Sequence, residues 1–174
     1  MLEIKEIKEN QFDEIWPIFQ DVVRDADSYP YPPDITKEEA KKLWFSPNTH
    51  VYVAYLDDKP VATRYIVPNK IGPASHIANT GVMIDKNYRG RGLGKTMMEF
   101  GIKKTKELGY KAIQLNLVLC TNIASIKICK EYGFEIVGTI PNAFYYKNEK
   151  YVDAYIMHNA LWKINENKNC AAIP

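Results

Sequence analysis

Basic residues and glycines alternate in one short stretch of the chain. This stretch follows an apolar segment, Val82-Met83-Ile84, and reads Arg89-Gly90-Arg91-Gly92-Leu93-Gly94-Lys95. Glycine has no side chain, so several backbone N–H groups can approach one anion closely, and arginine and lysine add positive charge around it. An amphipathic segment follows directly, which places these N–H groups at the start of a helix, where anions bind. The stretch therefore predicts a binding site for a phosphate or pyrophosphate.

Two common phosphate-binding motifs do not have this spacing. The nucleoside-triphosphate P-loop needs a glycine five positions before the Gly94-Lys95-Thr96 triplet, and Arg89 occupies that position. The dinucleotide motif G-x-G-x-x-G needs its third glycine one residue later than Gly94. The alternative without a ligand is a tight strand-to-helix turn with a solvated basic rim.

The motif R-x-x-G-x-G from Arg89 to Gly94, preceded by Tyr88 and by a strand that ends in Ile84, resembles the coenzyme A pyrophosphate loop of the GNAT acetyltransferase superfamily. The resemblance covers nearly the whole chain and implies acetyl-CoA as co-substrate. In the family, the end of the strand contacts the pantetheine arm and the thioester through its backbone. The residues implied in cofactor binding are Val82, Met83, Ile84, Arg89, Gly90, Arg91, Gly92, Leu93, Gly94, Lys95 and Asn122.

Acetyl transfer to an amine needs a neutral amine, a stabilised oxyanion and departure of a thiolate. Many members of the family place a glutamate on the strand before the loop, but here Asp85 lies at its far end and Asn79 further inside. Asparagine cannot act as a base. Asn79 is therefore predicted to orient the acceptor or a water, with solvent taking the proton. The alternative role is a hydrogen-bonded strand residue.

The family also has an asparagine at the start of the penultimate helix, an aromatic acid seven residues later, and then glycine-phenylalanine. Asn122 and Gly133-Phe134 match this pattern, but Cys129 occupies the aromatic position, and Tyr132 need not point to the same place. A thiol with a pKa of about 8.5 leaves without a general acid, so this departure predicts a slower enzyme rather than an inactive one. No histidine is tied to Cys129 by a motif, which favours a core residue over a nucleophile.

Asparagines and tyrosines are the candidate contacts to the acceptor. Gln114-Leu115-Asn116 and Thr121 to Ser125, together with Asn79, resemble the subgroup that includes fungal acetyltransferases acting on proline analogues. That resemblance implies catalytic roles for Asn79 and Asn122 and substrate contacts for Asn79 and Asn116. In the family the segment between the first two helices lies over the acceptor, so Tyr29 and Tyr31 are predicted to contact the substrate from a lid. A surface loop stiffened by proline is the alternative.

The apolar spacing predicts the elements that carry these residues. A stripe from Phe12 to Ala26 indicates a first helix, with Pro17 causing a kink or a break. Thr36 and Glu39 form a capping-box pattern before a second helix, which runs to Phe45 with Ala40, Leu43 and Trp44 facing inward. Residues 51–67 read as a hairpin that turns at Asp57-Asp58-Lys59, and residues 76–84 as the strand before the loop.

Beyond the loop, a third helix ends at Gly109, and the near-continuous apolar run Ala112–Leu119 predicts a central strand covered on both faces. Asn122 begins a fourth helix, and residues 134–139 and 151–157 read as the last strands, with a turn near Asn148. The predicted fold class is α/β, a GNAT fold with a mixed, mostly antiparallel sheet of six to seven strands, a central parallel pair and about four flanking helices. Residues 1–164 are predicted to form one domain, and residues 165–174 a flexible tail.

Composition limits the functional classes. The 174 residues carry a net charge of +2, which does not provide the basic field typical of nucleic-acid binding. The N-terminus lacks the apolar core of a signal peptide, and no window resembles a membrane span, so a cytoplasmic protein is expected. Cys120, Cys129 and Cys170 are predicted to be free thiols, and the isolated histidines His50, His76 and His158 suggest no metal site.

The predicted activity is direct transfer of the acetyl group of acetyl-CoA to a primary or secondary amine of a small molecule, such as an amino acid or an amine-like acceptor, in a ternary complex. A homodimer is expected because it is common among similar proteins. Three alternatives stay open: a non-catalytic acyl-CoA-binding or sensing domain, acetylation of a protein or peptide amine, and a nucleotide-binding regulator.

Overall fold

The computed structural model describes residues 1–161, which form seven strands, four α-helices and three short 3₁₀ helices. The strands are β1 (Leu2–Ile7), β2 (His50–Leu56), β3 (Lys59–Pro68), β4 (Ile77–Ile84), β5 (Ala112–Leu119), β6 (Glu135–Tyr146) and β7 (Lys150–Ala160). The helices are α1 (Trp16–Arg24), α2 (Lys37–Trp44), α3 (Leu93–Glu107), α4 (Ile123–Glu131), η1 (Glu9–Glu14), η2 (Gly72–Ala74) and η3 (Lys86–Tyr88). The predicted tail, residues 165–174, and Cys170 lie outside the described residues. Within residues 1–161, no helix combines the length and apolar character needed to cross a membrane.

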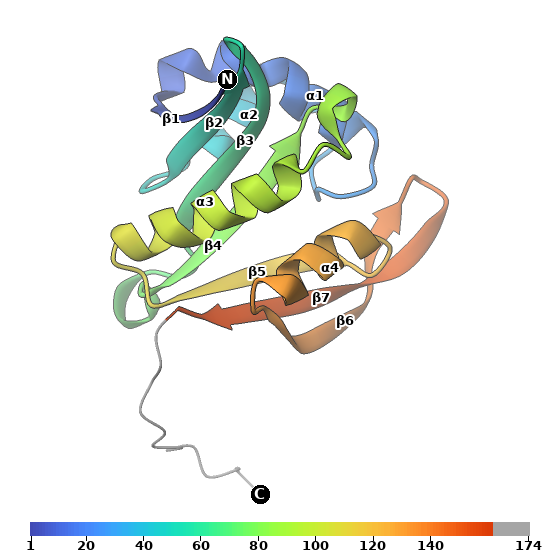
Figure 1. Ribbon diagram of the computed structural model, residues 1–174. Coiled ribbons are helices and arrows are strands. Elements are labelled where there is room, and N and C mark those ends of the chain that lie inside the picture. The colour runs from blue at the N-terminus through green and yellow to red at the C-terminus, as the bar shows by residue number, and fades with distance from the viewer. Residues whose placement is uncertain (162–174) are drawn as a thin grey trace, which may run out of the picture.

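The seven strands form one mixed sheet in the order β1-β2-β3-β4-β5-β7-β6 (Figure 1). Neighbouring strands are antiparallel except β4 and β5, which are parallel and lie in the middle of the order. The strand–helix–strand unit β4-α3-β5 makes this parallel connection. The predicted sheet with its central parallel pair is confirmed.

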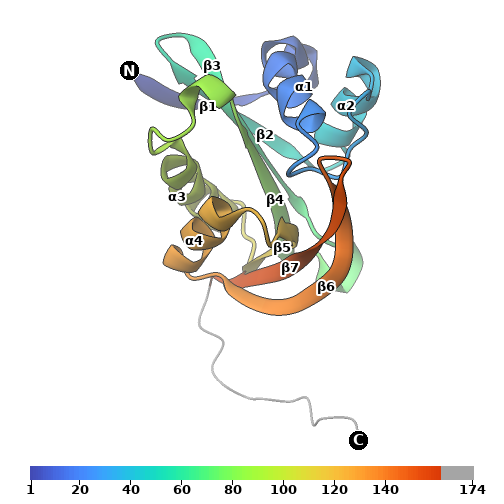
Figure 2. The same cartoon turned by 90° about the vertical axis from the view of Figure 1, so that its right-hand side faces the viewer.

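Helices cover both faces of the sheet: α1 and α2 lie on one side, and α3 and α4 on the other (Figure 2). On the first side Phe12, Phe19 and Trp44 pack with Met83 of β4 in one apolar cluster. On the second side Met97 of α3 packs against β2 and β3. Burial of these apolar side chains on both faces is the main force that fixes the helices on the sheet.

Local sequence signals explain how the helices begin. The predicted break at Pro17 is confirmed, because the apolar stripe forms η1 and then α1, with Pro17 in the first turn of α1, where a missing N–H costs little. The capping box of α2 is also confirmed, since Thr36 Oγ1 accepts a hydrogen bond from the Glu39 N–H at 3.3 Å. The inward orientation predicted for Leu43 is wrong: it is 47% exposed, because only the Ala40 and Trp44 side of α2 meets the core.

The parallel pair β4–β5 is short. Only Ile77 with Ala112 and Ala78 with Ile113 are paired, and beyond them the two strands diverge (Figure 1). Continuous coverage of β5 is therefore a wrong prediction, since its ends are buried but its middle is only partly buried and Asn116 is exposed. The apolar run of β5 predicts a strand, but it does not indicate at which residue the neighbouring strand β4 stops pairing with it. The separation opens a gap in the centre of the sheet.

The last two strands are longer than predicted. The strand predicted over residues 134–139 is β6, which continues to Tyr146 by means of an irregular register between Ile140 and Phe144, where Asn142 adopts φ 50°. A bulge of this kind lets a strand accommodate residues that cannot join the regular ladder.

Candidate active site

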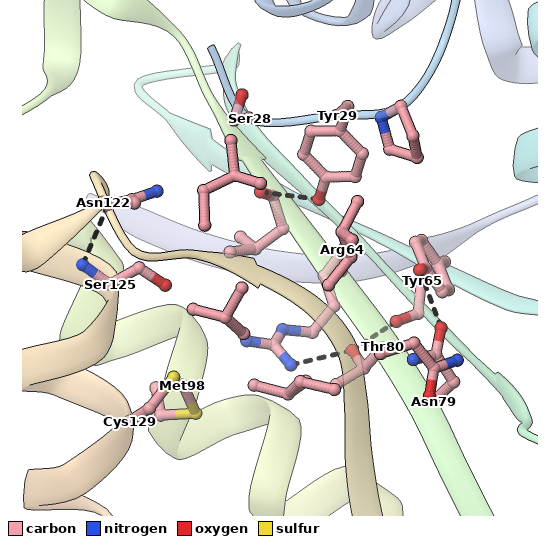
Figure 3. Close-up of a pocket in the computed structure, with 18 of the residues that line it drawn as sticks. Ser28, Tyr29, Arg64, Tyr65, Asn79, Thr80, Met98, Asn122, Ser125 and Cys129 are labelled. Carbon is pink, nitrogen blue, oxygen red and sulfur yellow. Dashed lines mark hydrogen bonds between the residues drawn. The ribbon is translucent and has the colours of Figure 1, made fainter. Parts of the chain in front are cut away.

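Two cavities meet where β4 and β5 diverge. The central cavity, of about 290 Å³, is lined mainly by the loop after α1 and by β3, β4, β5 and α4 (Figure 3). The outer cleft, of about 560 Å³, is lined by β4, the loop before α3, and the first turns of α3 and α4. Residues that line both are Ser28, Val82, Met98, Asn122 and Ser125. A ligand in the outer cleft can therefore meet a second ligand in the central cavity.

The glycine loop, residues 89–94, presents its backbone to the outer cleft. Gly90 and Gly92 adopt φ of 77° and 83°, the left-handed region that favours glycine. Within residues 1–161, no group accepts a hydrogen bond from the N–H groups of residues 89–94, whereas the Lys95 N–H already donates to the Gly92 carbonyl at 3.0 Å. A run of free N–H groups at the start of a 15-residue helix is suited to a phosphate.

Most of the cofactor residues predicted from the sequence gather around this cleft. Those that line it are Val82, Met83, Ile84, Arg89, Gly90, Gly92, Gly94, Lys95 and Asn122. Two do not line it. The Leu93 side chain is buried in the core below α3, and the Arg91 guanidinium lies over the Tyr88 ring, 5.1 Å from its centroid.

Two of the loop's cations already have acidic neighbours. Arg89 Nη2 lies 3.7 Å from Asp25 Oδ2, and Lys95 Nζ lies 2.6 Å from Glu131 Oε1. All four side chains are about half exposed, so these ion pairs are weak and can exchange for a phosphate.

The two edges of β4 differ in the partners they offer. The Asn69 N–H donates to the Ile77 carbonyl and the Asp85 N–H to the Val61 carbonyl, so the odd-numbered residues of β4 exchange hydrogen bonds with β3. The polar backbone groups of Val82 and Ile84 consequently point toward β5, where no paired strand remains. Met83 differs from its neighbours because its backbone is engaged with β3 and its side chain is fully buried among α1 and α2.

Asn79 lies between β4 and β5 and connects them. Its Oδ1 accepts a hydrogen bond from the Tyr65 hydroxyl at 2.9 Å, and its Nδ2 donates to the Gln114 carbonyl at 2.9 Å. Because the amide retains one lone pair and one N–H, Asn79 can still bind a group in the central cavity that it lines.

Asn116 and Asn122 line the central cavity from different sides. The Asn116 Nδ2 donates to Asn69 Oδ1 at 2.7 Å, and its Oδ1 accepts from Gln114 at 3.0 Å. Asn122 caps α4, because its Oδ1 accepts from the Ser125 N–H at 3.0 Å. Its side-chain NH₂ group lies where the two cavities meet and has no acceptor within the described part of the chain.

Tyr29 and Tyr31 close the central cavity from the loop after α1. The Tyr29 hydroxyl donates to the Val82 carbonyl at 2.9 Å, and burial raises its pKa. Tyr31 stacks on Phe19, with ring centroids 5.6 Å apart, and on Tyr29 at 5.8 Å. The loop is thus packed onto the core and bonded to β4.

Residues 11–134 match the model of the acetyltransferase (GNAT) family. The chain is 32% identical over 146 residues to N-acetyltransferase aca1 of Schizosaccharomyces pombe, covering 74% of this chain and 70% of that protein. It is 33% identical over 129 residues to L-amino acid N-acetyltransferase AaaT of Escherichia coli, covering 74% and 77% respectively. A GCN5-related N-acetyltransferase structure from Kribbella flavida aligns with a TM-score of 0.85 at 31% identity, covering 91% of this chain and 97% of that one.

The chain belongs to the GNAT acetyltransferase family. The predicted family, the GNAT fold and the enzyme class, an acetyl-CoA-dependent N-acetyltransferase, are thereby confirmed.

Cys129 is the point at which this GNAT chain departs from the family's aromatic residue. Its side chain lines the central cavity but is 1% exposed. Burial raises the pKa of the thiol, and the hydroxyl of Ser125 and the charge of Arg64 oppose that shift less strongly. Tyr132 packs in the cluster between α4 and β5 and is absent from the lining of both cavities.

The sequence reasoning missed several polar residues of the central cavity, above all Arg64, Tyr65 and Thr80. Arg64 interrupts the apolar run of β3, which is the signal that could have drawn attention to it. The described lining of this cavity contains no aspartate, glutamate, histidine or lysine, so Arg64 carries its one formal charge. Burial raises the pKa of Tyr65, which keeps its hydroxyl protonated.

Proposed function

We propose that this GNAT enzyme transfers the acetyl group of acetyl-CoA directly to the amine of a small molecule, an amino acid or an amine-like acceptor, in a ternary complex. The observation that carries the proposal is the pair of cavities that meet between β4 and β5. One can hold the donor and the other the acceptor, so that no covalent enzyme intermediate is needed.

The outer cleft fits coenzyme A. Acetyl-CoA supplies an activated acetyl thioester, and its pyrophosphate suits the free N–H groups of residues 89–94. Arg89 and Lys95 would leave Asp25 and Glu131 for the phosphates. The backbone groups of Val82 and Ile84 face the gap and would bind the pantetheine arm, while the Asn122 amide would donate where the cavities meet.

The central cavity suits an acceptor whose proton leaves through water. A lysine-like amine, with a pKa near 10.4, costs about 4 to 5 kcal/mol to deprotonate at pH 7. The described lining offers no carboxylate, imidazole or lysine as a base. Asn79 and Asn116 would therefore orient the amine and a water, and solvent would take the proton.

Two observations favour a small molecule over a protein amine. Tyr29 and Tyr31 cover the central cavity and are stacked on the core, which leaves little room for an extended peptide. The name of the relative AaaT specifies an L-amino acid as its substrate. A cytoplasmic location and a homodimer stay predictions.

An acceptor panel that follows release of the free coenzyme A thiol tests the proposal. The panel contains amino acids, simple primary and secondary amines, and a short peptide with a free N-terminus. Turnover of small amines above the peptide supports the proposal. Binding of acetyl-CoA without turnover of any acceptor would instead favour the non-catalytic sensor.

Two variants test the acceptor site separately from the fold. Asn79→Ala removes the side chain that faces the cavity, and Tyr65→Phe removes only its hydrogen-bond partner. We expect Asn79→Ala to lower kcat/KM at least about tenfold more than Tyr65→Phe, since orientation of the acceptor depends on the amide itself. Equal losses would assign Asn79 to the connection between the strands.

A further inference from the structure

Arg64 is a buried cation at the centre of the molecule. It lies on β3, is 2% exposed, and its guanidinium group extends toward Met98 and Cys129 (Figure 3). Its Nη1 donates to Thr80 Oγ1 at 2.9 Å, whereas its buried Nε has no partner within residues 1–161. The guanidinium group therefore has unused hydrogen-bonding capacity beside the central cavity.

No acidic side chain in the described part of the chain neutralises this cation. The ion pairs among residues 1–161 do not include Arg64, and the groups whose charges act on it are Tyr29, Cys129 and Tyr65, each protonated at neutral pH. Burial lowers the pKa of Arg64 to about 10, so it is still charged at pH 7. A buried charge without a counter-ion is costly, and such charges are normally paired.

Helix α3 is built to make room for this side chain. A Cβ atom at Gly101 would lie 2.3 Å from Arg64 Nη1 and 2.5 Å from Cζ, so the guanidinium group packs directly on the helix backbone. Glycine inside a helix is destabilising relative to alanine. The close packing, together with Thr80, holds the guanidinium group in place before any ligand arrives.

We propose that Arg64 binds a carboxylate in the central cavity and thereby selects acceptors that carry one. The inference rests on the proposed function and narrows its substrate class to amino acids and other amines with a carboxylate. Arginine binds a carboxylate through two parallel N–H···O hydrogen bonds. Such a pair would engage N–H groups of Arg64 that do not bond to Thr80, and the carboxylate would neutralise the charge of the guanidinium group. A carboxylate on the acyl chain of the donor is the second possible source of the same chemistry.

Matched acceptors test the inference with acetyl-CoA as donor. L-leucine is compared with L-leucinamide and 3-methylbutylamine, and L-proline with prolinamide and pyrrolidine. We expect wild-type kcat/KM to be more than about 100-fold higher for the carboxylates, because an acceptor without one leaves the cation unpaired. Arg64→Met should remove this preference, because it should lower kcat/KM for the carboxylates far more than for the matched simple amines. Arg64→Lys should restore only part of it, because lysine lacks the two-pronged geometry.

A second arm distinguishes the two sources of the carboxylate. Succinyl-CoA and propionyl-CoA are compared as donors to 3-methylbutylamine. A preference for succinyl-CoA that is lost in Arg64→Met assigns the carboxylate to the acyl chain and retains the role of Arg64. Equal rates for the two donors, together with an acceptor preference, assign it to the acceptor.

Binding to the wild-type protein keeps the inference testable if the variants do not fold. With coenzyme A present, L-leucine or L-proline should raise Tm more than the corresponding amides do. If small amines turn over but carboxylates give no advantage in rate or in Tm, the inference is wrong and the proposed function stands. A uniform loss for all acceptors in folded Arg64→Met would also overturn it, since Arg64 would then act on the reaction centre or the fold.

Discussion

The surroundings of Cys129 keep its side chain protonated and enclosed. The thiol faces the central cavity, but burial raises its pKa, which disfavours the thiolate that a covalent relay would need. Cys129 therefore replaces the aromatic general acid of the family, but it does not supply a nucleophile in its place. In the proposed reaction, the chemistry depends on the asparagines, on the backbone of β4 and on the intrinsic ability of a thiolate to leave.

We expect Cys129→Ala and Cys129→Ser to retain most of kcat. Steady-state kinetics with saturating acetyl-CoA would measure this, and a melting curve would confirm that each variant is folded. A more than thousandfold fall in kcat for a folded variant that still binds acetyl-CoA, about 4 kcal/mol of transition-state stabilisation, would refute the expectation.

Gly92 offers a test of the phosphate site with a matched control. Gly92 and Gly109 both have positive φ, 83° and 88°, and a Cβ atom added at either meets nothing within 4 Å. Valine should therefore cost each variant a similar strain, about 1 to 2 kcal/mol of unfolding free energy. Only Gly92→Val should abolish coenzyme A binding, because only Gly92 belongs to the glycine loop. Calorimetric titration measures the affinity, and equal affinity in both variants would place the phosphates elsewhere.

Among the individual residues of the site, those that form a contiguous motif could be predicted from the sequence. The glycine loop could be identified because its spacing lies within one segment of the chain. Arg64 is marked in the sequence only as a charge within an apolar strand, and its role could not be predicted from that, because its surroundings include Gly101 and Thr80, which lie on other elements. The hydrogen bonds of Asn79 to Tyr65 and to Gln114 were hidden for the same reason: a side chain's partners across strands follow from register, which the sequence does not state.

Helix α2 carries a pH-dependent cap. Hydrogen bonds from the Thr36 hydroxyl and from the Thr36 N–H lower the pKa of Glu39 below its usual 4.5. A carboxylate with a lowered pKa in the folded state stabilises the fold above the unfolded-state pKa, and this contribution is lost as the pH falls through the folded-state value.

Glu39→Ala should therefore destabilise the protein at pH 7 and much less at pH 3. Urea unfolding at both pH values measures the difference, with Glu99→Ala, at an exposed position of α3, as the control for helix propensity. A Glu39→Ala effect as large at pH 3 as at pH 7 would show that the carboxylate is not the stabilising group.

Elements were predictable where a local signal decides their limits. Pro17 and the capping box of α2 fixed two helix starts, because both act through neighbouring backbone groups. The predicted end of β6 at residue 139 is wrong, since pairing with β7 continues beyond it to Tyr146. The divergence of β5 from β4 is likewise a property of two elements together, and neither strand encodes it alone.

For the whole molecule, binding of the donor should appear as added stability. Acetyl-CoA at 100 times its dissociation constant should contribute about 2.7 kcal/mol to the free energy of unfolding, because it binds only the folded state. Thermal melting at increasing acetyl-CoA concentration measures this, with ATP as the control ligand. Stabilisation by ATP but not by coenzyme A would favour a nucleotide-binding regulator.

Because the two edges of β4 have different hydrogen-bond partners, the backbone amides along this strand should differ in their rates of hydrogen–deuterium exchange. The amides of Gly81 and Met83 are bonded to β3 and should exchange slowly, while those of Val82 and Ile84 face the gap and should exchange quickly in the free enzyme. Donor binding should slow Val82 and Ile84 and leave their neighbours unchanged; uniform rates along β4 would contradict this. Slow and fast amides would then alternate along β4. The slow amides would belong to the edge that is always paired with β3, and the fast amides to the edge that gains hydrogen bonds only when the donor binds.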